Sequence, residues 1–508
     1  MERLKSFTLS IGNKKFFKYL FIIIGFFIPA YLSISIVVSG NIPFWYDSAR
    51  DLSAAVANLK KISLIGQTTG IPGLFYGPYW IWLLSLGISV SKDPRIILLL
   101  VITIPYLVIF PILLIKIFGY INGIILWLVF FFSTGVYYMT HLWNPVVAPL
   151  LLLFIIFIAA KLLESMRNSY LMVIFIGILT GVLMQFHMSL GFGIFIGNIF
   201  LIFLIFVNSN FKFSKKAIAW SKFNNFFVYF IGFLLSFLPF LVFELRHNFM
   251  QLNSIFEVFI SQEKVIGITG MSKNEIIQTF FGRLEVLLKQ PLWLIGTAFL
   301  SLTYYKLLKD KWNIFSFRKK LHIYLLSLLF TILSVYLTAK NPVWGYHFTG
   351  IEVIFLVLLG LYINKFNVAR IILILVLLLS ASAYLREYMY SVQSNPLSHG
   401  SLYTKKYITQ MILKDSKNEN ITVFAYSPSI YVFEYSYLFN WLGNMNVPYD
   451  PSLNPTESQL VYLILPPTQN SSAVEDFINY RTPNSKYKTG EIFEIPDGTK
   501  ILKRIRNE

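Results

Sequence analysis

The sequence predicts an α-helical protein that crosses a membrane many times and ends in a small soluble α/β domain. Of its 508 residues, 56% are hydrophobic and only 13% are charged, whereas soluble domains contain about 25% charged residues. About eleven apolar runs are long enough to span a bilayer. The last stretch of roughly 120 residues has no such run and shows short strand and helix patterns instead.

Apolar runs of spanning length follow one another as far as residue 385. The first, residues 19–38, follows a basic N-terminal segment and is longer than the core of a typical signal peptide, so we expect an uncleaved span. The run 74–90 is apolar too, but Gly77, Pro78 and several bulky aromatic residues near its start favour a surface or re-entrant helix. The other predicted spans are 96–118, 120–138, 145–163, 169–187, 190–207, 225–243, 291–307, 321–338, 348–363 and 370–385.

The distribution of basic residues predicts which side each loop faces. The chain carries 43 Lys and Arg against 24 Asp and Glu, a formal net charge of +19. If the run 74–90 does not span, the lysine-rich loops 208–224 and 306–320 fall on the same side as the N-terminus. Because basic residues collect in cytoplasmic loops, we expect a cytoplasmic N-terminus and an extracytoplasmic C-terminus. The charge then follows from topology, and no nucleic acid partner is expected.

Two domains are expected. Residues 1–385 would form the membrane domain, with outer loops at 40–95 and 244–290. Residues 386–508 would form an extracytoplasmic α/β domain, in which 12 basic and 12 acidic residues cancel. In this domain the predicted strands are Ile421–Ser427 and Leu460–Pro466, and the predicted helices are Leu402–Leu413 and Ala473–Tyr480.

The composition limits the chemistry further. The chain has no cysteine, so it can form neither disulfides nor thiolate metal sites. Any metal would need His, Asp or Glu as ligands. The high content of Ile, Phe, Lys and Asn is typical of an AT-rich prokaryotic gene, which would place the protein in a prokaryotic cell membrane.

Polar and ionisable residues that are not needed for crossing the membrane fall near the outer ends of the predicted spans. Helices far apart in sequence could bring these residues to one shared cavity. The alternative is coincidence, because polar residues collect at any membrane boundary. The candidates are Asp47, Arg50, Asp51, Tyr76, His141, Asn144, His187, Glu244, Arg246, His247, Tyr346, His347 and Glu352.

The stretch 41–52, NIPFWYDSARDL, is the strongest candidate for the reaction centre. Asp47 and Arg50 are three residues apart, so on a helix they share a face. An anion held by Arg50 would then lie beside Asp47. The structural alternative is an ordinary solvated helix start.

Several of the other candidates have an equally simple structural role. Asn144 precedes a proline that opens a helix, so we expect it to cap that helix. Arg246 could bind a phosphate or could pair with Glu244. His187 could be functional or could hydrogen-bond to the backbone. Glu352 is a carboxylate inside a predicted span, where it must face protein or water.

Five short motifs occur in a characteristic order. They are Asp47, Ala49 and Arg50 of WYDSARDL, FYGPYWIW at 75–82, WNP at Trp143–Pro145, FELRH at Phe243–His247 and GYH at Gly345–His347. In this order they resemble the GT-C superfamily of integral membrane glycosyltransferases, and within it the family 39 group, with the aminoarabinose transferases and protein O-mannosyltransferases. The resemblance covers residues 20–385.

The resemblance implies transfer of a sugar from a polyprenyl-phosphate-linked donor to an acceptor hydroxyl on the extracytoplasmic face. The acceptor could be a glycan, a lipid or a protein. Asp47 would act as general base or orient the acceptor, and Arg50 or Arg246 would hold the lipid phosphate. A cation at the interface stabilises the leaving phosphate, while a carboxylate deprotonates the attacking hydroxyl.

No cofactor is certain. A divalent metal could be bound by Asp47 with His187 and His347. However, Ser48 and Asn144 stand where many members of the family carry acidic residues, which weakens the case for a metal held by paired carboxylates.

Two other functions stay open. A transporter or lipid flippase would suit the number of spans, although transporters usually show sites near the midplane and internal repeats. In this sequence the polar residues gather at one face, and no repeat is evident. A non-catalytic relative that only binds polyprenyl lipids is the third hypothesis.

Overall fold

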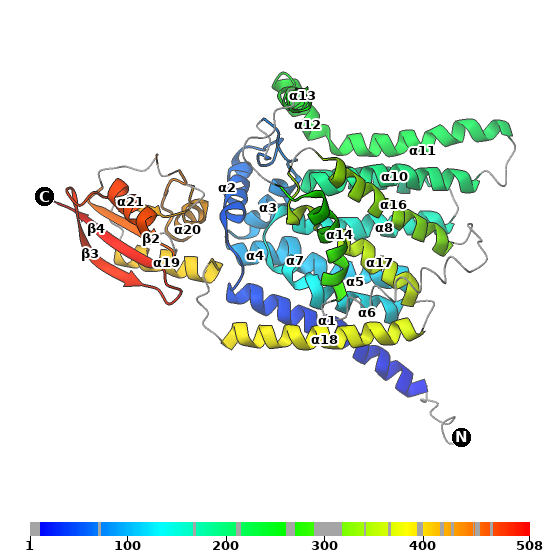
Figure 1. Ribbon diagram of the computed structural model, residues 1–508, viewed down its shortest axis with the longest axis horizontal. Coiled ribbons are helices and arrows are strands. Elements are labelled where there is room, and N and C mark those ends of the chain that lie inside the picture. The colour runs from blue at the N-terminus through cyan, green and yellow to red at the C-terminus, as the bar shows by residue number, and fades with distance from the viewer. Residues whose placement is uncertain are drawn as a thin grey trace.

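The structure is a helical bundle joined to a small α/β domain (Figure 1). It is a computed structural model that describes residues 11–69, 73–165, 169–209, 215–260, 270–288, 317–339, 342–363, 367–393, 400–416, 421–427, 431–450, 452, 458–467 and 471–507.

The structure has helices at most of the spans that the sequence predicts. The bundle is built from helices of 5 to 29 residues. They are α1 (Ile11–Ser39), α4 (Pro94–Leu98), α5 (Ile104–Phe118), α6 (Tyr120–Phe130), α7 (Val136–Thr140), α8 (Ala148–Ser165), α9 (Tyr170–Phe186), α10 (Met188–Ser209), α11 (Lys215–Ser236), α12 (Leu238–Arg246), α13 (Met250–Ile260), α14 (Lys273–Leu288), α16 (Phe317–Thr338), α17 (Ile351–Ile363) and α18 (Asn367–Gln393). Short π-helical segments (Leu99–Thr103 and Phe131–Gly135) join α4 to α5 and α6 to α7, and 3-10 turns (Asn144–Val147 and Gly345–Phe348) precede α8 and α17.

Within the described residues, six helices are long and apolar enough to cross a membrane, or seven if α11 and α12, bent by 59°, form one span. Three further predicted spans correspond to the shorter apolar helices Ile23–Ser39, Tyr170–Phe186 and Leu373–Arg386. The predicted span 291–307 lies outside the described residues. A multi-pass helical fold is therefore confirmed, and the total of about eleven spans stays a prediction.

Helices α2 (Tyr46–Lys60) and α3 (Tyr79–Val90) lie at the end of the bundle that faces the α/β domain (Figure 1). With 12 residues, α3 is about 18 Å long, which is too short for a hydrocarbon core of about 30 Å. This geometry agrees with the prediction that the run 74–90 does not span.

Small residues let α9 and α11 pack closely. A Cβ atom added to Gly177 would lie 2.2 Å from the carbonyl oxygen of Tyr229, and one added to Gly232 would lie 2.2 Å from that of Ile174. Small residues at membrane helix interfaces bring backbones together and increase van der Waals contact. These two glycines therefore set the spacing of the pair.

The α/β domain carries one four-stranded sheet with the order β1-β2-β4-β3. Strands β1 and β2 are parallel, and β4 pairs antiparallel with both β2 and β3. Every residue of β2 is buried, as its continuous apolar run predicts. The elements are α19 (Leu402–Asp415), β1 (Ile421–Ala425), α20 (Phe433–Gly443), β2 (Leu460–Leu465), α21 (Ser471–Arg481), β3 (Tyr487–Glu494) and β4 (Lys500–Arg506).

Three of these elements were not predicted: α20, β3 and β4. Strand β3 is exposed at most positions, so it lacks the continuous apolar run that marked β1 and β2. Helix α18 continues to Gln393 and so passes position 386, the predicted start of the second domain. The domain boundary stays a prediction.

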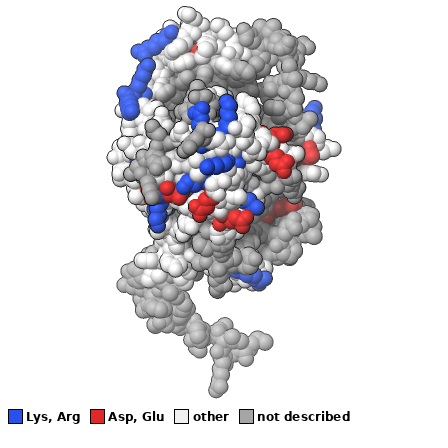
Figure 2. All heavy atoms as spheres, turned by 90° about the vertical axis from the view of Figure 1, so that its left-hand side faces the viewer, with Lys and Arg blue, Asp and Glu red and all other residues white. Residues whose placement is uncertain are grey.

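Figure 2 shows basic and acidic side chains mixed over the described part of the end at which this domain lies.

The α/β domain is tied to the segment that leads into α2. The backbone N–H of Leu402 donates to the carbonyl of Ile42 at 2.9 Å. Lys405 reaches from α19 to the carbonyl of Phe44 at 2.7 Å and to Glu434 at 3.0 Å. The start of α2 is therefore fixed by residues some 360 positions later in the chain.

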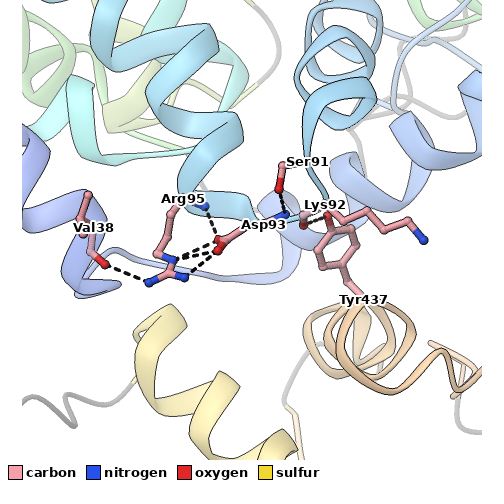
Figure 3. A network of polar contacts seen from close by, with 6 residues as sticks. All are labelled: Val38, Ser91, Lys92, Asp93, Arg95 and Tyr437. Atoms are coloured by element: carbon pink, nitrogen blue, oxygen red, sulfur yellow. Dashed lines mark hydrogen bonds and ion pairs between the residues drawn. The ribbon is translucent and has the colours of Figure 1, made fainter.

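A second tie joins α20 to the turn between α3 and α4 (Figure 3). Tyr437 donates its hydroxyl to the carbonyl of Lys92 at 2.6 Å. Next to it, Asp93 caps α4 by accepting the N–H of Arg95. The guanidinium of Arg95 pairs with Asp93 at 2.6 Å and donates to the carbonyl of Val38 at 2.9 Å, where α1 ends. This network connects the end of α1, the turn after α3 and the start of α4 to helix α20 of the α/β domain.

Candidate functional site

The first turns of α2 carry a network of ion pairs. Asp47 lies 3.0 Å from one terminal nitrogen of Arg50. Arg50 also donates from Nε and the other terminal nitrogen to one oxygen of Asp51, each at 2.9 Å. Trp80 of α3 donates its indole N–H to the other oxygen of Asp51 at 2.8 Å. One guanidinium thus joins an accessible carboxylate, Asp47 with 40% exposure, to a buried one, Asp51 with 1%.

Asp51 is buried and Asp47 is accessible, so the two carboxylates lie in different electrostatic environments. Burial raises the pKa of Asp51 from 3.8 to about 7, although Arg50 and Trp80 favour the charged form. Burial lowers the pKa of Arg50, but Asp51 and Asp47 outweigh this effect and the net direction is upward. Arg50 therefore stays charged in any condition that the protein meets.

Aromatic rings connect α2 to a second group of polar residues. The ring of Trp45, just before α2, lies 5.5 Å from that of His141 and 6.1 Å from that of Trp143. Trp143 in turn lies 5.4 Å from Tyr346. Tyr76, in the loop before α3, is within electrostatic reach of Tyr346 and of the ion pairs on α2, and burial raises its pKa to about 12.

The second group surrounds the junction of α9 with α10. His187 is buried there and donates from Nε2 to the carbonyl of Tyr346 at 3.1 Å. Its ring lies 6.3 Å from that of His347. His347 accepts the N–H of Trp344 through Nδ1 at 3.1 Å. The predicted residues His187, Tyr346 and His347 are therefore brought together, and Trp143 links them to the α2 side.

Arg283 on α14 completes this group, and the sequence analysis missed it. One of its terminal nitrogens donates to the carbonyl of Gly345 at 2.5 Å. Burial lowers the pKa of Arg283, and Tyr137, Tyr336 and His187 lie within its electrostatic reach. Among the described residues no carboxylate pairs with it. Arg283 belongs to no motif, so its sequence carried no signal that could have identified it.

The FELRH motif lies apart from both groups in its contacts. Glu244 is buried and accepts the N–H groups of Gln251 and Leu252 at 3.2 and 3.1 Å, so it caps α13. His247 stacks on Phe243 at 4.0 Å and hydrogen-bonds to its carbonyl at 2.8 Å. Arg246 is exposed, and within the described residues it makes no ion pair with Glu244. Of the two alternatives for Arg246, the pair with Glu244 is therefore not found among the described residues.

Three other candidates serve the backbone. Asn144 does not cap its helix, contrary to prediction: it is itself the first residue of the 3-10 turn, and its amide donates to the carbonyl of Phe186 at 2.9 Å, at the end of α9. Glu352 is fully buried and accepts the N–H of Gly350 at the start of α17. His141 hydrogen-bonds to the carbonyl of Tyr137 at 2.7 Å, and burial lowers its pKa to about 4.

The metal candidates do not converge. In the part of the chain that the structure describes, no group of three or more His, Asp or Glu side chains could hold a metal ion. Asp47 is paired with Arg50, whereas His187 and His347 are hydrogen-bonded to the backbone. The predicted set of Asp47, His187 and His347 therefore does not fit a metal.

Comparisons with known proteins identify the fold. No family model matches the sequence, and no curated protein matches it. Two solved structures of ArnT from Cupriavidus metallidurans are similar. The one bound to undecaprenyl phosphate has a TM-score of 0.54 and 9% identity over 95% of this chain and 97% of that chain. The apo structure has a TM-score of 0.56 and 10% identity over 96% of this chain and 98% of that one.

The chain has the GT-C fold. This confirms the fold that the resemblance of the sequence motifs implied. At this level of identity the likeness shows the fold alone, so the roles of individual residues rest on their geometry. In that fold, α2 presents Asp47 and Arg50 beside the α/β domain, and the second group presents His187 and Arg283 from distant helices.

Proposed function

We propose that the protein is a membrane glycosyltransferase that moves a sugar from a polyprenyl-phosphate-linked donor to an acceptor hydroxyl on the extracytoplasmic side. The observation that carries this proposal is the contact of an accessible carboxylate, Asp47, with a guanidinium that is held in place by a second, buried carboxylate. The bound undecaprenyl phosphate of the ArnT neighbour supports a lipid donor of this class.

In the proposed reaction, the acceptor oxygen attacks the anomeric carbon of the donor sugar. The bond from that carbon to the phosphate oxygen breaks, polyprenyl phosphate leaves, and Asp47 takes the proton of the acceptor hydroxyl. General base catalysis of this kind contributes about 10²–10⁴-fold. Asp47 suits the role because it is the accessible carboxylate of the network, whereas Asp51 is buried.

The departing phosphate needs positive charge at the moment the bond breaks. Arg50 can supply it beside Asp47, because Asp51 fixes the guanidinium before the reaction step and is itself held by the indole N–H of Trp80. Arg283 is the second candidate, since it is half-buried and has no carboxylate partner in the described residues. We assign phosphate binding to Arg50 and Arg283 in preference to Arg246, which is exposed on α12.

The transporter hypothesis draws on one observation, the broken pair α11 and α12. Broken helices in transporters expose backbone groups to an ion or substrate. Here the carbonyl of Ser236 at the break accepts the hydroxyl of Tyr79 at 2.8 Å and the amide of Gln185 at 2.7 Å. Side chains of the protein therefore satisfy this group, and the break is explained without a transported ion.

The test is a transfer assay with purified protein, a polyprenyl-phosphate sugar and a panel of glycan, lipid and protein acceptors. Asp47→Asn keeps the shape of the side chain and removes the base, so we expect transfer to fall by about 10²–10⁴-fold while binding of undecaprenyl phosphate persists. Glu164→Gln, at an exposed cytoplasmic position by the predicted topology, is the matched control. Full transfer by Asp47→Asn would move the base elsewhere, and lipid movement without transfer would favour the transporter.

A further inference from the structure

Three aromatic residues of the α/β domain form what we call the aromatic shelf: Tyr431, Phe433 and Tyr449. Phe433 and Tyr449 stack with ring centroids 4.3 Å apart and planes within 11°. Tyr431 lies 6.2 Å from Phe433 and 6.0 Å from Tyr449. We propose that the aromatic shelf binds a sugar ring of the acceptor, which makes the acceptor a carbohydrate or a glycan-bearing molecule. This inference rests on the proposed function and names its acceptor class.

The aromatic shelf adjoins the ion pairs of α2. Phe433 meets Tyr46 edge to face, with centroids 5.0 Å apart. The guanidinium of Arg50 lies 5.4 Å from the centroid of Tyr46, and the same guanidinium contacts Asp47 at 3.0 Å. Three contacts therefore join the shelf to the proposed base: Phe433 to Tyr46, Tyr46 to Arg50, and Arg50 to Asp47. A molecule lying on the shelf can present a hydroxyl to Asp47 without moving far from the domain.

The shelf is fixed yet open to solvent. Tyr431 is 39% exposed and Tyr449 is 43% exposed. The backbone N–H of Val432 donates to the carbonyl of Tyr449 at 2.9 Å, which pins the two segments together. Within the described residues, the hydroxyls of both tyrosines make no hydrogen bond. Rigid rings with free hydroxyls offer a large contact area at little entropic cost.

A sugar ring fits these features better than the donor lipid does. Its C–H face packs on the electron-rich face of an aromatic ring, and its equatorial hydroxyls need hydrogen-bond partners at the rim. The two tyrosine hydroxyls supply such partners. A polyprenyl chain has no hydroxyls to match and is stabilised in the bilayer instead. The mixed charges of this end of the molecule (Figure 2) favour no strongly charged polymer.

The experiment measures sugar binding directly, by saturation-transfer NMR on the full-length protein in nanodiscs with methyl β-glucoside, methyl α-mannoside and methyl β-galactoside. We expect transfer to the ring C–H protons of at least one glycoside, and a loss of at least fivefold in the double variant Tyr431→Ala/Tyr449→Ala. Both side chains are exposed, so the variant should fold. The matched control is Tyr480→Ala, a tyrosine of the same domain that is 77% exposed.

The outcome separates this inference from the proposed function. Asp47→Asn should retain saturation transfer while losing sugar transfer, because it leaves the shelf intact. Absence of saturation transfer to any glycoside would overturn the inference, as would equal signals in the double variant and the wild type. Binding of a tyrosine-free peptide that the double variant loses, with no glycoside binding, would identify a protein acceptor instead and would also overturn it.

Discussion

Arg50 is shared by two carboxylates that lie in different surroundings. Asp47 is accessible to solvent and Asp51 is not, so only the first can meet a substrate. Asp51 instead accepts Nε–H of Arg50 and the indole N–H of Trp80, which fixes the direction of the guanidinium. We therefore regard Asp51 as a positioning residue. Removing one partner of such a buried pair typically costs about 3–5 kcal/mol.

The raised pKa of Asp51 predicts how stability depends on pH. The folded protein holds the proton up to about pH 7, whereas an unfolded aspartate releases it near 3.8. The folded state thus binds more protons between these values, and stability falls as the pH rises through this window. His141, whose pKa is lowered, contributes with the opposite sign, so the prediction concerns the difference between two proteins. We expect the thermal unfolding midpoint of Asp51→Asn, relative to that of the wild type, to rise from pH 4.5 to pH 7.5.

Glu164→Gln serves as the control for this prediction, because Glu164 is 54% exposed in a surface ion pair with Lys161. It should leave the pH profile unchanged. A difference between Asp51→Asn and the wild type that stays constant or falls over the same window would contradict the account of Asp51.

We expect donor binding to depend on Arg283 and not on Arg246. A charged hydrogen bond contributes about 1.5–3 kcal/mol, so Arg283→Gln should weaken binding of undecaprenyl phosphate by about 10–100-fold. Arg246→Gln should change the affinity less than twofold. Equal losses in both variants, measured by titration in detergent, would argue against a specific role for Arg283.

Among single residues, the sequence was most informative where spacing alone fixes a contact. Asp47 and Arg50 share a face because they are three apart on a helix, and the structure pairs them. Asn144, Glu244 and Glu352 could not be predicted in this way. Their partners are backbone groups at the ends of other elements or at turns, and those ends are defined only once the helices are packed. Arg283 was missed because a lone arginine carries no motif.

The pairing of α9 with α11 depends on glycine. Gly177→Ala would place a methyl group 2.2 Å from the carbonyl of Tyr229. Overpacking of this kind costs about 1–3 kcal/mol, so the unfolding midpoint should fall. The control is Gly282→Ala on α14, where no atom lies within 4 Å of the added Cβ. It should be neutral or stabilising, since alanine favours a helix. Equal stability of both variants would show that the glycine contact does not set the helix spacing.

The length of the apolar runs predicted the helices of the bundle well. The residue pattern predicted only part of the sheet in the α/β domain. The runs that became β1 and β2 are buried on both faces and so stand out in the sequence. Strand β3 is exposed along most of its length, so its own residues do not predict a strand. Its pairing with β4 holds it in the sheet. Helix α20 was missed as well, although it carries both Tyr437 and Phe433 of the aromatic shelf.

The predicted topology assigns each loop to one side of the membrane. Because the chain has no cysteine, single introduced cysteines can test this assignment by labelling. By the predicted topology, the α/β domain is extracytoplasmic and the end of α8 is cytoplasmic. We expect Tyr480→Cys to react with a membrane-impermeant maleimide in intact cells, and Glu164→Cys to react only after permeabilisation. Both positions are exposed, so access to the reagent depends on the membrane alone. The reverse labelling pattern would invert every loop.

The structure contains two polar groups. One is Asp47 with Arg50 on α2, and the other contains His187 and Arg283 from helices far apart in the sequence. An experimental structure of the protein with undecaprenyl phosphate would examine whether these groups form one donor site. We predict phosphate density in contact with Arg50, Arg283 or both, at the end of the bundle that carries the α/β domain. Phosphate density at the opposite end, or at the exposed Arg246 with neither arginine in contact, would contradict the account.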